Sequence, residues 1–403
     1  MAFSPLITRL YGPEAFGLQG VFTSVVGLLI VVAAMGYPTA IVLPRHDADA
    51  LGLARLSILI AIGVALLTTI ALSIFGVEIL RMLNAEAIGA LIYLIPLAMI
   101  ISVLGGVLGQ WLIRKRVFGL SARYGVLTTL ITSSTKAGLG FLHPTALILI
   151  ATNTFGALVG TLLTWRGWRK HSSKLLKTNA EHASTPTLTL VQLAKQHRDF
   201  PLLRTPQNLI NAFSQSLPVL LLASYFGAAS AGQYAIAIGV LGMPAGLIGG
   251  SVMSVFYPRI NEAIHNGEDA RALIVKATLG MAAMGVLPFV VILVAGPALF
   301  EFVFGKGWNT AGVYAQLLAA WLFFAFINKP VISAIPALKL QGFLLVHELF
   351  SVTFRVSALY MGFRVLQSEF SAIFAFSLVG VLLNLFLILY VIAHSDDKRM
   401  ATR

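Results

Sequence analysis

Cysteine is absent from this chain of 403 residues, and only 11% of the residues are charged. The first absence excludes disulfide bonds and thiolate metal sites. The eight histidines show no spacing typical of metal ligands, and the sequence contains neither a phosphate-binding glycine loop nor a nucleophile elbow. We therefore predict no metal, no cofactor and no catalytic residues.

Apolar residues make up 58% of the chain. A soluble domain of this size could not bury that fraction, so the sequence predicts an all-α polytopic membrane protein. A helix that crosses about 30 Å of hydrocarbon needs roughly 20 apolar residues. The expected full spans, about 11 of them, lie near residues 16–36, 56–76, 87–110, 124–141, 145–165, 207–226, 231–256, 273–295, 311–327, 343–361 and 370–392.

A stretch near the N-terminus recurs in the second half of the chain. The matching positions are Gly12 with Gly227, Gly17 with Gly232, and Pro44-Arg45 with Pro258-Arg259. Repeats of this length are common in transporters, so the pattern predicts two six-helix lobes related by an internal repeat. By this repeat, residues 1–10 match only the end of the span 207–226. Because ten residues make a helix of only about 15 Å, we expect the first helix to be truncated, either in nature or through a start codon assigned too late.

The predicted organisation is an N-terminal lobe (1–165), a basic linker (166–206) and a C-terminal lobe (207–403). The linker reads as a tether with one interfacial helix near 190–198. Its basic residues belong to one set of alternate loops, whereas the opposite set holds only Arg9, Arg81, Lys306 and Arg364. The positive-inside rule therefore predicts that the linker and the C-terminus lie in the cytoplasm. The net charge of +13 fits anionic lipid headgroups, and we expect no nucleic-acid partner.

The run PLITRLYGPEAFGLQGVF…YPTAIVLPRHDADA is similar to the opening of the polysaccharide biosynthesis proteins. These are flippases for lipid-linked oligosaccharides within the multidrug/oligosaccharidyl-lipid/polysaccharide exporter superfamily. The resemblance covers the whole chain in span number and layout, and its sharp motif covers roughly the first fifty residues. It implies two six-helix lobes that open alternately to either side of the membrane, and this sequence departs from it by lacking most of the first helix.

Four polar residues open the second half of the chain: Arg204, Asn208, Asn211 and Gln215. Their spacing of i, i+4, i+7 and i+11 puts them on one helical face, which we call the amide stripe. Polar groups inside a span are costly in hydrocarbon, so the stripe is expected to bind substrate along a water-filled pathway. The alternative is hydrogen bonding between helices of one lobe. Pro218, just beyond the stripe, would bend the helix.

Three further ionisable residues fall inside predicted spans and are candidates for substrate binding. Lys136 either reaches the membrane boundary or meets an anion. Glu348 and Arg355 share a face but stand about 10 Å apart along the helix axis, too far to pair directly. Glu348 is a candidate proton or cation relay, with a buried ion pair as the alternative. Lys329, followed by a proline, is expected to mark the cytoplasmic end of a helix.

These observations lead to one functional hypothesis and several rivals. The diphosphate of a polyprenyl-linked oligosaccharide would be attracted by Arg204, Lys136 and Arg355, and its sugars would be bound by amides. Rocking of the lobes would then carry it across the cytoplasmic (inner) membrane. The product would serve O-antigen, capsule or exopolysaccharide synthesis. Consumption of product or an ion gradient would drive the step. Expected partners are membrane lipids, the lipid-linked substrate, and the glycan polymerase and glycosyltransferases of the same pathway.

A cation-coupled drug exporter of the same superfamily is the main rival, and it would use Glu348. A degraded, nonfunctional relative is another. A glycan polymerase or ligase usually needs a sizeable extracytoplasmic loop, and the predicted loops on that face are short. Asp47-Ala48-Asp49 resembles the DxD motif of glycosyltransferases, but acidic residues at a helix start are ordinary caps. We therefore predict that the chain is not an enzyme.

Overall fold

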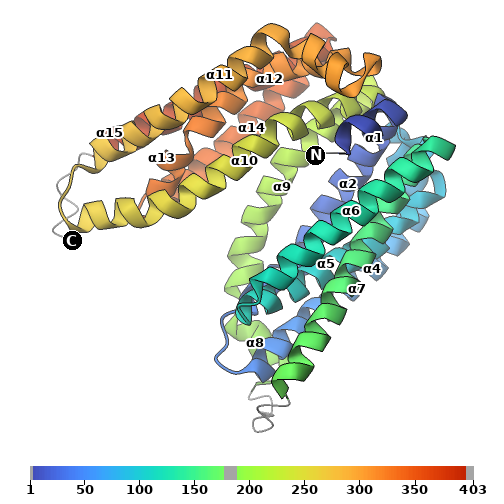
Figure 1. Ribbon diagram of the computed structural model, residues 1–403, viewed down its shortest axis with the longest axis vertical. Coiled ribbons are helices and arrows are strands. Elements are labelled where there is room, and N and C mark those ends of the chain that lie inside the picture. Colours follow the sequence, from blue (N-terminus) through green and yellow to red (C-terminus); the bar gives the residue numbers. More distant parts are fainter. Residues whose placement is uncertain (1–2, 177–187, 396–403) are drawn as a thin grey trace. The chain divides into compact units, whose positions relative to one another are not determined.

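The computed structural model describes residues 3–176 and 188–395 of the chain. Within these ranges every regular element is a helix, which confirms the all-α prediction. The chain divides into two compact units, Met1–Gly232 (unit 1) and Gln233–Arg403 (unit 2). In each unit most of the helices are long and run alongside one another (Figure 1).

Unit 1 begins with two short helices on either side of a long one and ends with the first turn of a helix that continues into unit 2. Its elements are α1 (Ser4–Leu10), α2 (Pro13–Ala34), α3 (Tyr37–Ala40), α4 (Asp47–Met82), the 3₁₀ segment η1 (Glu86–Tyr93), α5 (Leu94–Arg114), α6 (Phe118–Leu142), α7 (Ala146–Leu176), α8 (Leu190–Gln196), the π-helical turn η2 (Phe200–Arg204) and α9 (Thr205–Phe226).

Unit 2 consists of α10, apart from its first turn, and the elements that follow. They are α10 (Ala228–His265), α11 (Ala270–Phe304), η3 (Lys306–Trp308), α12 (Asn309–Ile327), α13 (Lys329–Ala334), α14 (Gln341–Leu366) and α15 (Glu369–His394). Buried Gln233 joins two of these elements, because its Nε2 donates to the carbonyl of Gly307 (2.8 Å) and its Oε1 accepts from the backbone N–H of Ala311 (2.9 Å).

Ten helical segments in the described ranges are long and apolar enough to cross a membrane, so the chain is a multi-pass membrane protein. The sequence suggested about 11, and the difference is the expected span 124–141. It forms α6, a helix of 25 residues. This helix is long enough to span hydrocarbon at about 1.5 Å per residue. However, Arg123, Lys136 and several Thr and Ser residues make it less apolar than the other ten.

The stretch expected to be a linker, 166–206, is largely helical where the structure describes it. α7 continues to Leu176, α8 occupies most of the expected interfacial helix, and η2 leads directly into α9. Residues 177–187, at the middle of the expected tether, lie outside the described ranges. The structure groups α9 with unit 1, where it packs on α2. The repeat assigns α9 to the C-terminal lobe, and that lobe boundary stays a prediction.

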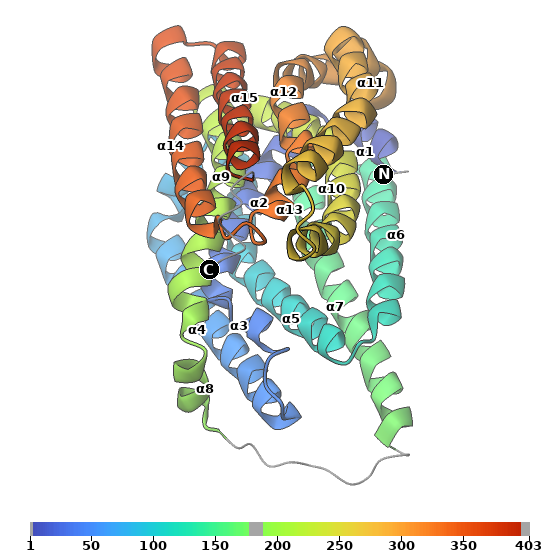
Figure 2. The same cartoon turned by 90° about the vertical axis from the view of Figure 1, so that its left-hand side faces the viewer.

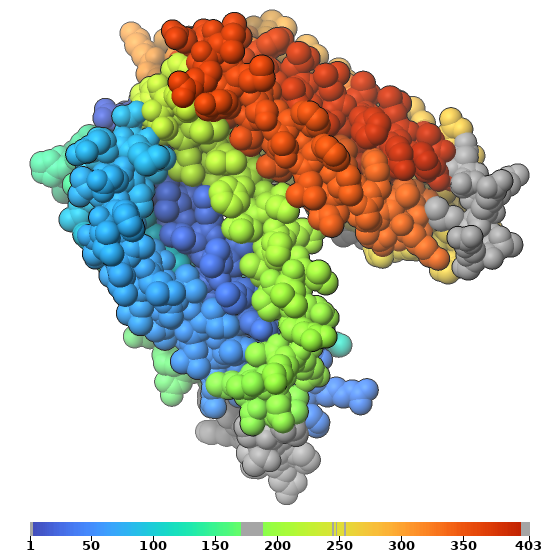
Figure 3. Space-filling model, turned by 180° about the vertical axis from the view of Figure 1, so that it is seen from behind, coloured from blue at the N-terminus to red at the C-terminus, as the bar shows by residue number. Residues whose placement is uncertain are grey.

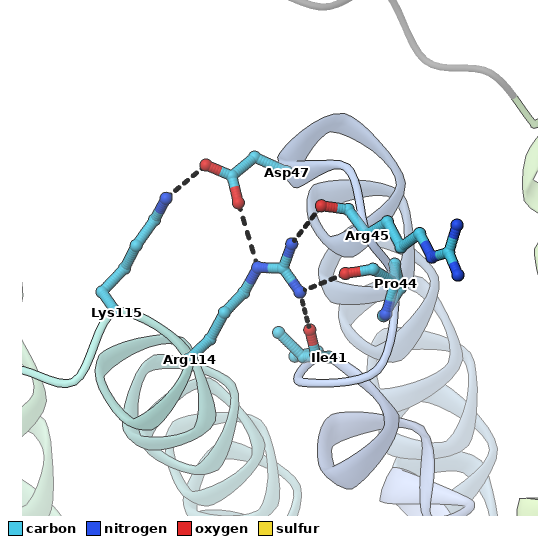
Figure 4. A network of polar contacts seen from close by, with 6 residues as sticks. All are labelled: Ile41, Pro44, Arg45, Asp47, Arg114 and Lys115. Atoms are coloured by element: carbon cyan, nitrogen blue, oxygen red, sulfur yellow. Dashed lines mark hydrogen bonds and ion pairs between the residues drawn. The ribbon is translucent and has the colours of Figure 1, made fainter.

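An arginine at the end of α5 holds the corner between α3 and α4 (Figure 4). The Arg114 guanidinium donates to the backbone carbonyls of Ile41 (3.2 Å), Pro44 (2.6 Å) and Arg45 (3.4 Å) and to Asp47 Oδ1 (3.0 Å). Lys115 Nζ donates to the other carboxylate oxygen of Asp47. The side chain of Arg114 is 10% exposed and that of Lys115 is 32% exposed. Asp47 therefore begins α4 with both of its carboxylate oxygens bonded, and its role at this corner is structural.

Candidate functional site

Asn208, Asn211 and Gln215 of the amide stripe lie in the N-terminal half of α9, and Arg204 ends η2 directly before it. Farther along the same helix, Val219, Leu222 and Ala223 are buried in unit 1. All four stripe residues, Arg204, Asn208, Asn211 and Gln215, are exposed at the surface of unit 1. Gln215 Nε2 donates to Asn211 Oδ1 over 3.2 Å, one helical turn away. All four side chains are thus accessible, although Arg204 ends a π-helical turn rather than lying on α9, and their contact with substrate stays a prediction.

The local structure of α9 follows from three prolines. Pro201 and Pro206 stand at the starts of η2 and α9, where a missing N–H is tolerated. Pro218 lies inside α9, where it removes one backbone donor from the helix. Within η2, the Arg204 guanidinium lies 6.0 Å from the ring centroid of Phe200. This aromatic face supports the arginine while its donors remain at the surface.

Lys136 is half-buried in α6 and meets a neutral amide. Its Nζ donates to Asn153 Oδ1 of α7 over 2.6 Å. The hydroxyl of fully buried Tyr11 donates to the backbone carbonyl of Lys136 (2.9 Å), so α6 is also joined to the turn before α2. Asn153 is not among the residues that the sequence singled out. The sequence did contain a signal for it, because Asn153 is the single amide within the apolar span 145–165 and a buried amide needs a hydrogen-bond partner.

Small residues bring α6 and α7 close together along the same face. Tyr124, Thr128 and Thr132 precede Lys136 at steps of four residues, and each fills space left by a glycine of α7. A Cβ added at Gly156 would lie 2.4 Å from Thr132 Oγ1, and one at Gly160 would lie 2.7 Å from Thr128 Cγ2. Close approach through small residues is typical of helix packing in membranes. It sets the register that aligns Lys136 with Asn153.

Arg355 lies in unit 2, half-buried among aromatic rings. Its guanidinium is 5.3 Å from the ring centroid of Trp321 on α12 and 5.6 Å from that of Phe376 on α15. Its Nε donates to the carbonyl of Ser351, one turn earlier on α14 (3.2 Å). The two rings are themselves packed edge to face, 5.1 Å apart. The aromatic pair therefore fixes the position of the cation in the interior of unit 2.

Glu348, on the same helix, is half-buried and has no hydrogen bond or ion pair within the described residues. As the spacing of the two residues predicted, Glu348 and Arg355 do not form an ion pair. The adjacent His347 is buried, and its Nε2 lies 3.0 Å from the carbonyl of Leu383 on α15. Lys329, expected at a helix end, begins α13, and its aliphatic stem covers Gly249 of α10.

The site residues fall into separate groups. Lys136 and the amide stripe belong to unit 1, and Arg355 and Glu348 belong to unit 2. Unit 2 holds a further polar pair, in which the amide of buried Asn328 donates to Oδ1 of half-buried Asn384. Among the described residues, no group of three or more His, Asp or Glu side chains could hold a metal ion.

Comparison with known proteins gives one family and several solved structures. A family model described as "Polysaccharide biosynthesis protein" matches residues 6–312. The succinoglycan biosynthesis transport protein ExoT of Rhizobium meliloti (strain 1021) is 23% identical over 320 residues, which are 78% of this chain and 61% of that protein. This chain therefore spans less than two thirds of that relative.

Two solved structures share the fold at low sequence identity. A multidrug resistance MATE family transporter of the MOP superfamily aligns with a TM-score of 0.74 and 13% identity, covering 100% of this chain and 95% of that chain. The lipid II flippase MurJ aligns with a TM-score of 0.70 and 15% identity, covering 97% of this chain and 84% of that chain. Because the family model covers more than half of the sequence, the chain belongs to the polysaccharide biosynthesis protein family.

Proposed function

We propose that this chain flips a lipid-linked oligosaccharide, carried on a polyprenyl diphosphate, across the cytoplasmic membrane by alternating access. The observation that carries this proposal is the family match over residues 6–312. The name of the relative ExoT, a transport protein of succinoglycan biosynthesis, points to the same class of cargo. The product would serve O-antigen, capsule or exopolysaccharide synthesis, together with a polymerase and glycosyltransferases of the same pathway.

The chemistry of the amide stripe suits such a cargo. Sugar hydroxyls both donate and accept hydrogen bonds, and the side chains of Asn208, Asn211 and Gln215 offer both kinds of group at the surface of unit 1. Arg204, at the start of the stripe, offers a planar fork of donors that matches phosphate oxygens. At an effective dielectric constant near 20, a pair of opposite charges 4 Å apart attracts by about 4 kcal/mol. The stripe would thus bind the diphosphate at one end and sugars along its length.

Lys136 and Arg355 have a less direct role in this proposal. Lys136 is committed to Asn153, and Arg355 is held by Trp321 and Phe376. Both are basic side chains, and in their charged form they would add to the potential that attracts an anionic headgroup. The cytoplasmic location of the C-terminus and of the basic segment before α9 completes the proposal and rests on the loop charges.

The test is surface glycan export in a host that lacks its own flippase and is complemented by this chain. Arg204→Glu should reduce export by at least about tenfold, because the phosphate contact becomes repulsive. Arg204→Lys should retain part of the activity. Arg166→Glu, which reverses an exposed charge on α7, is the matched control and should be neutral. Unchanged export by Arg204→Glu at equal protein level would exclude the amide stripe as the substrate path.

A second candidate, a cation-coupled exporter of drugs or other small molecules, is favoured by Glu348. This half-buried acid has no partner within the described residues, and coupling carboxylates are typical of such exporters. In everted vesicles, Glu348→Gln would abolish ion-driven extrusion of a cationic dye under this alternative. Under the flippase proposal the wild type extrudes no dye. Glu348→Gln then retains glycan export, except where an ion gradient drives that export.

A further inference from the structure

An open apolar pocket of about 330 Å³ lies between α4 and α8, on unit 1. Figure 2 shows α8 beside α4, and in Figure 3 the side of α4, in blue, is open to the surroundings. The residues that line the pocket are Leu56, Leu190, Val191, Ala194, Lys195 and Arg198. Four are apolar, two are basic and none is acidic.

The short helix α8 is fixed to the helices beneath it. The side chain of Leu193 is buried against Gly52 of α4, where an added Cβ would lie 2.4 Å from Leu193 Cδ1. The hydroxyl of Tyr37 donates to the carbonyl of Ala194 (3.4 Å), and Asp49 Oδ1 accepts from the backbone N–H of Leu188 (3.2 Å). Thr189 and Gln192 cap the helix reciprocally. These contacts hold α8 in a defined position, so the pocket wall that it forms is fixed as well.

The residues of α8 and of the turn after it that line the pocket combine apolar and basic side chains. Val191 and Lys195 share a face of α8 at i and i+4, and Arg198 follows in the turn after the helix. All three line the pocket. Val191 is 65% exposed although it is apolar. Lys195 and Arg198 are also exposed. A short helix with this pattern is suited to the boundary between hydrocarbon and headgroups, where basic side chains meet lipid phosphates.

The pocket continues along α4 as an exposed apolar surface. From Leu56 the same side of the helix carries Leu59, Leu67, Ile70 and Ile74, at i+3, i+11, i+14 and i+18. Leu67 is 67% exposed and the other three are exposed as well. The span Asp47–Met82 is apolar enough to cross a membrane. A hydrocarbon chain that enters the pocket beside Leu56 can therefore lie along α4 without meeting a charged group of this face.

We propose that the α4–α8 pocket binds an anionic glycerophospholipid, with one acyl chain against Leu56 and Val191 and the phosphate bound by Lys195 and Arg198. The apolar wall excludes free phosphate as the ligand, because a small anion would gain nothing from it. The two cations distinguish an anionic lipid from a zwitterionic one. The site would tie the segment before α9 to the membrane surface, and it does not depend on which cargo the chain carries.

Native mass spectrometry of the full chain in detergent tests this site, with phosphatidylglycerol or phosphatidylcholine added at equal concentration. The wild type should bind phosphatidylglycerol about tenfold more tightly than phosphatidylcholine, since two basic contacts supply the preference. The variant K195Q/R198Q should lose this preference. The control R123Q/R166Q removes two exposed charges from α6 and α7 and should keep it.

A second variant tests the apolar half of the site while leaving the cations in place. Ala194→Trp fills the pocket and should lower the binding of phosphatidylglycerol, whereas inorganic phosphate alone should leave the melting temperature of the wild type unchanged. Circular dichroism and size-exclusion profiles establish that each variant is folded. Equal phosphatidylglycerol binding by the wild type and K195Q/R198Q would overturn the proposal. So would displacement of phosphatidylglycerol by an equal amount of a polyprenyl phosphate, which would make the pocket a carrier site.

Discussion

Gly17 and Gly232 are equivalent by the internal repeat, and in unit 1 they lie directly against each other. A Cβ added at Gly232 would fall 2.7 Å from the backbone nitrogen of Gly17 and 1.9 Å from the carbonyl oxygen of Pro13. A Cβ added at Gly17 would fall 1.6 Å from the carbonyl oxygen of Ala228. The two glycines allow α2 and the first turn of α10 to approach at backbone distance. The repeated motif thus marks a contact between its own two copies.

Gly17→Ala and Gly232→Ala should each destabilise the protein, by on the order of 1–3 kcal/mol or more, because the new methyl group meets backbone that cannot rotate away. The expected result is a lower melting temperature in detergent and reduced membrane yield. Gly27→Ala and Gly239→Ala are matched controls, since nothing lies within 4 Å of a Cβ at either position. Equal melting temperatures for all four variants would contradict the close approach of α2 and the first turn of α10.

Arg114→Gln should be more harmful than Lys115→Gln. The first change removes the donor of the part-buried carbonyls of Ile41 and Pro44 and of the exposed carbonyl of Arg45, and an unpaired polar group costs roughly 1–3 kcal/mol where it is buried. Lys115 contributes only a partly exposed ion pair with Asp47, which is worth about 0–1 kcal/mol. Thermal unfolding of the two variants in the same detergent checks the order. A larger effect of Lys115→Gln would contradict the arrangement in Figure 4.

Lys136 and Asn153 should show strong coupling in a double-mutant cycle. Asn153→Leu removes the acceptor of the Lys136 ammonium and leaves a half-buried charge without its partner. Lys136→Met removes the charge itself, so adding it to Asn153→Leu should recover stability, with a coupling free energy of about 0.5–3 kcal/mol. Melting temperatures of the wild type, both single variants and the double variant provide the cycle. Additive effects would mean that the two side chains do not interact.

The ion pair between Arg259 and Glu268 should make stability depend on pH in the acid range. The hydrogen bond from Arg259 (Nη2 to Oε2, 2.5 Å) holds the pKa of the Glu268 carboxyl below its ordinary value. A carboxyl with a lowered folded-state pKa stabilises the protein above its unfolded pKa, near 4.3, and loses that effect as the pH falls through the folded pKa.

The variant Glu268→Gln serves as the reference for this pair. Its melting temperature should lie slightly below that of the wild type at neutral pH, because the pair is exposed. The gap should close as the pH falls below about 4. High salt at neutral pH should reduce the same gap, since exposed pairs are screened. A gap that is constant from neutral to acidic pH would show that Glu268 acts through something other than its charge.

The sequence predicts the helices of this protein well because their apolar content and length are local properties. Residues 124–141 are the instructive exception. They form a helix as expected, but two of the threonines that reduce the apolarity of α6, Thr128 and Thr132, pack against glycines of α7. Hydropathy records the polarity of these side chains but not the partners that they contact. A count of spans by hydropathy therefore leaves α6 out, although the segment forms a long helix.

The candidate site is less accessible to sequence reasoning, because it depends on which helices become neighbours. The exposure of Asn211 and Gln215 on one face follows from the helical period. The partners of Lys136 and Arg355 do not, since Asn153, Trp321 and Phe376 come from other helices whose register no local pattern specifies. A buried cation indicates that a partner exists, and only the packing identifies it.

The Arg114 corner also has a consequence for the order in which the protein is made. The carbonyls of Ile41, Pro44 and Arg45 receive their donor from a residue about seventy positions further along the chain. The ribosome therefore delivers α4 and all of α5, up to its last residue, before the turn that precedes α4 can obtain this donor. The corner can reach its final hydrogen bonding only once α5 has been made.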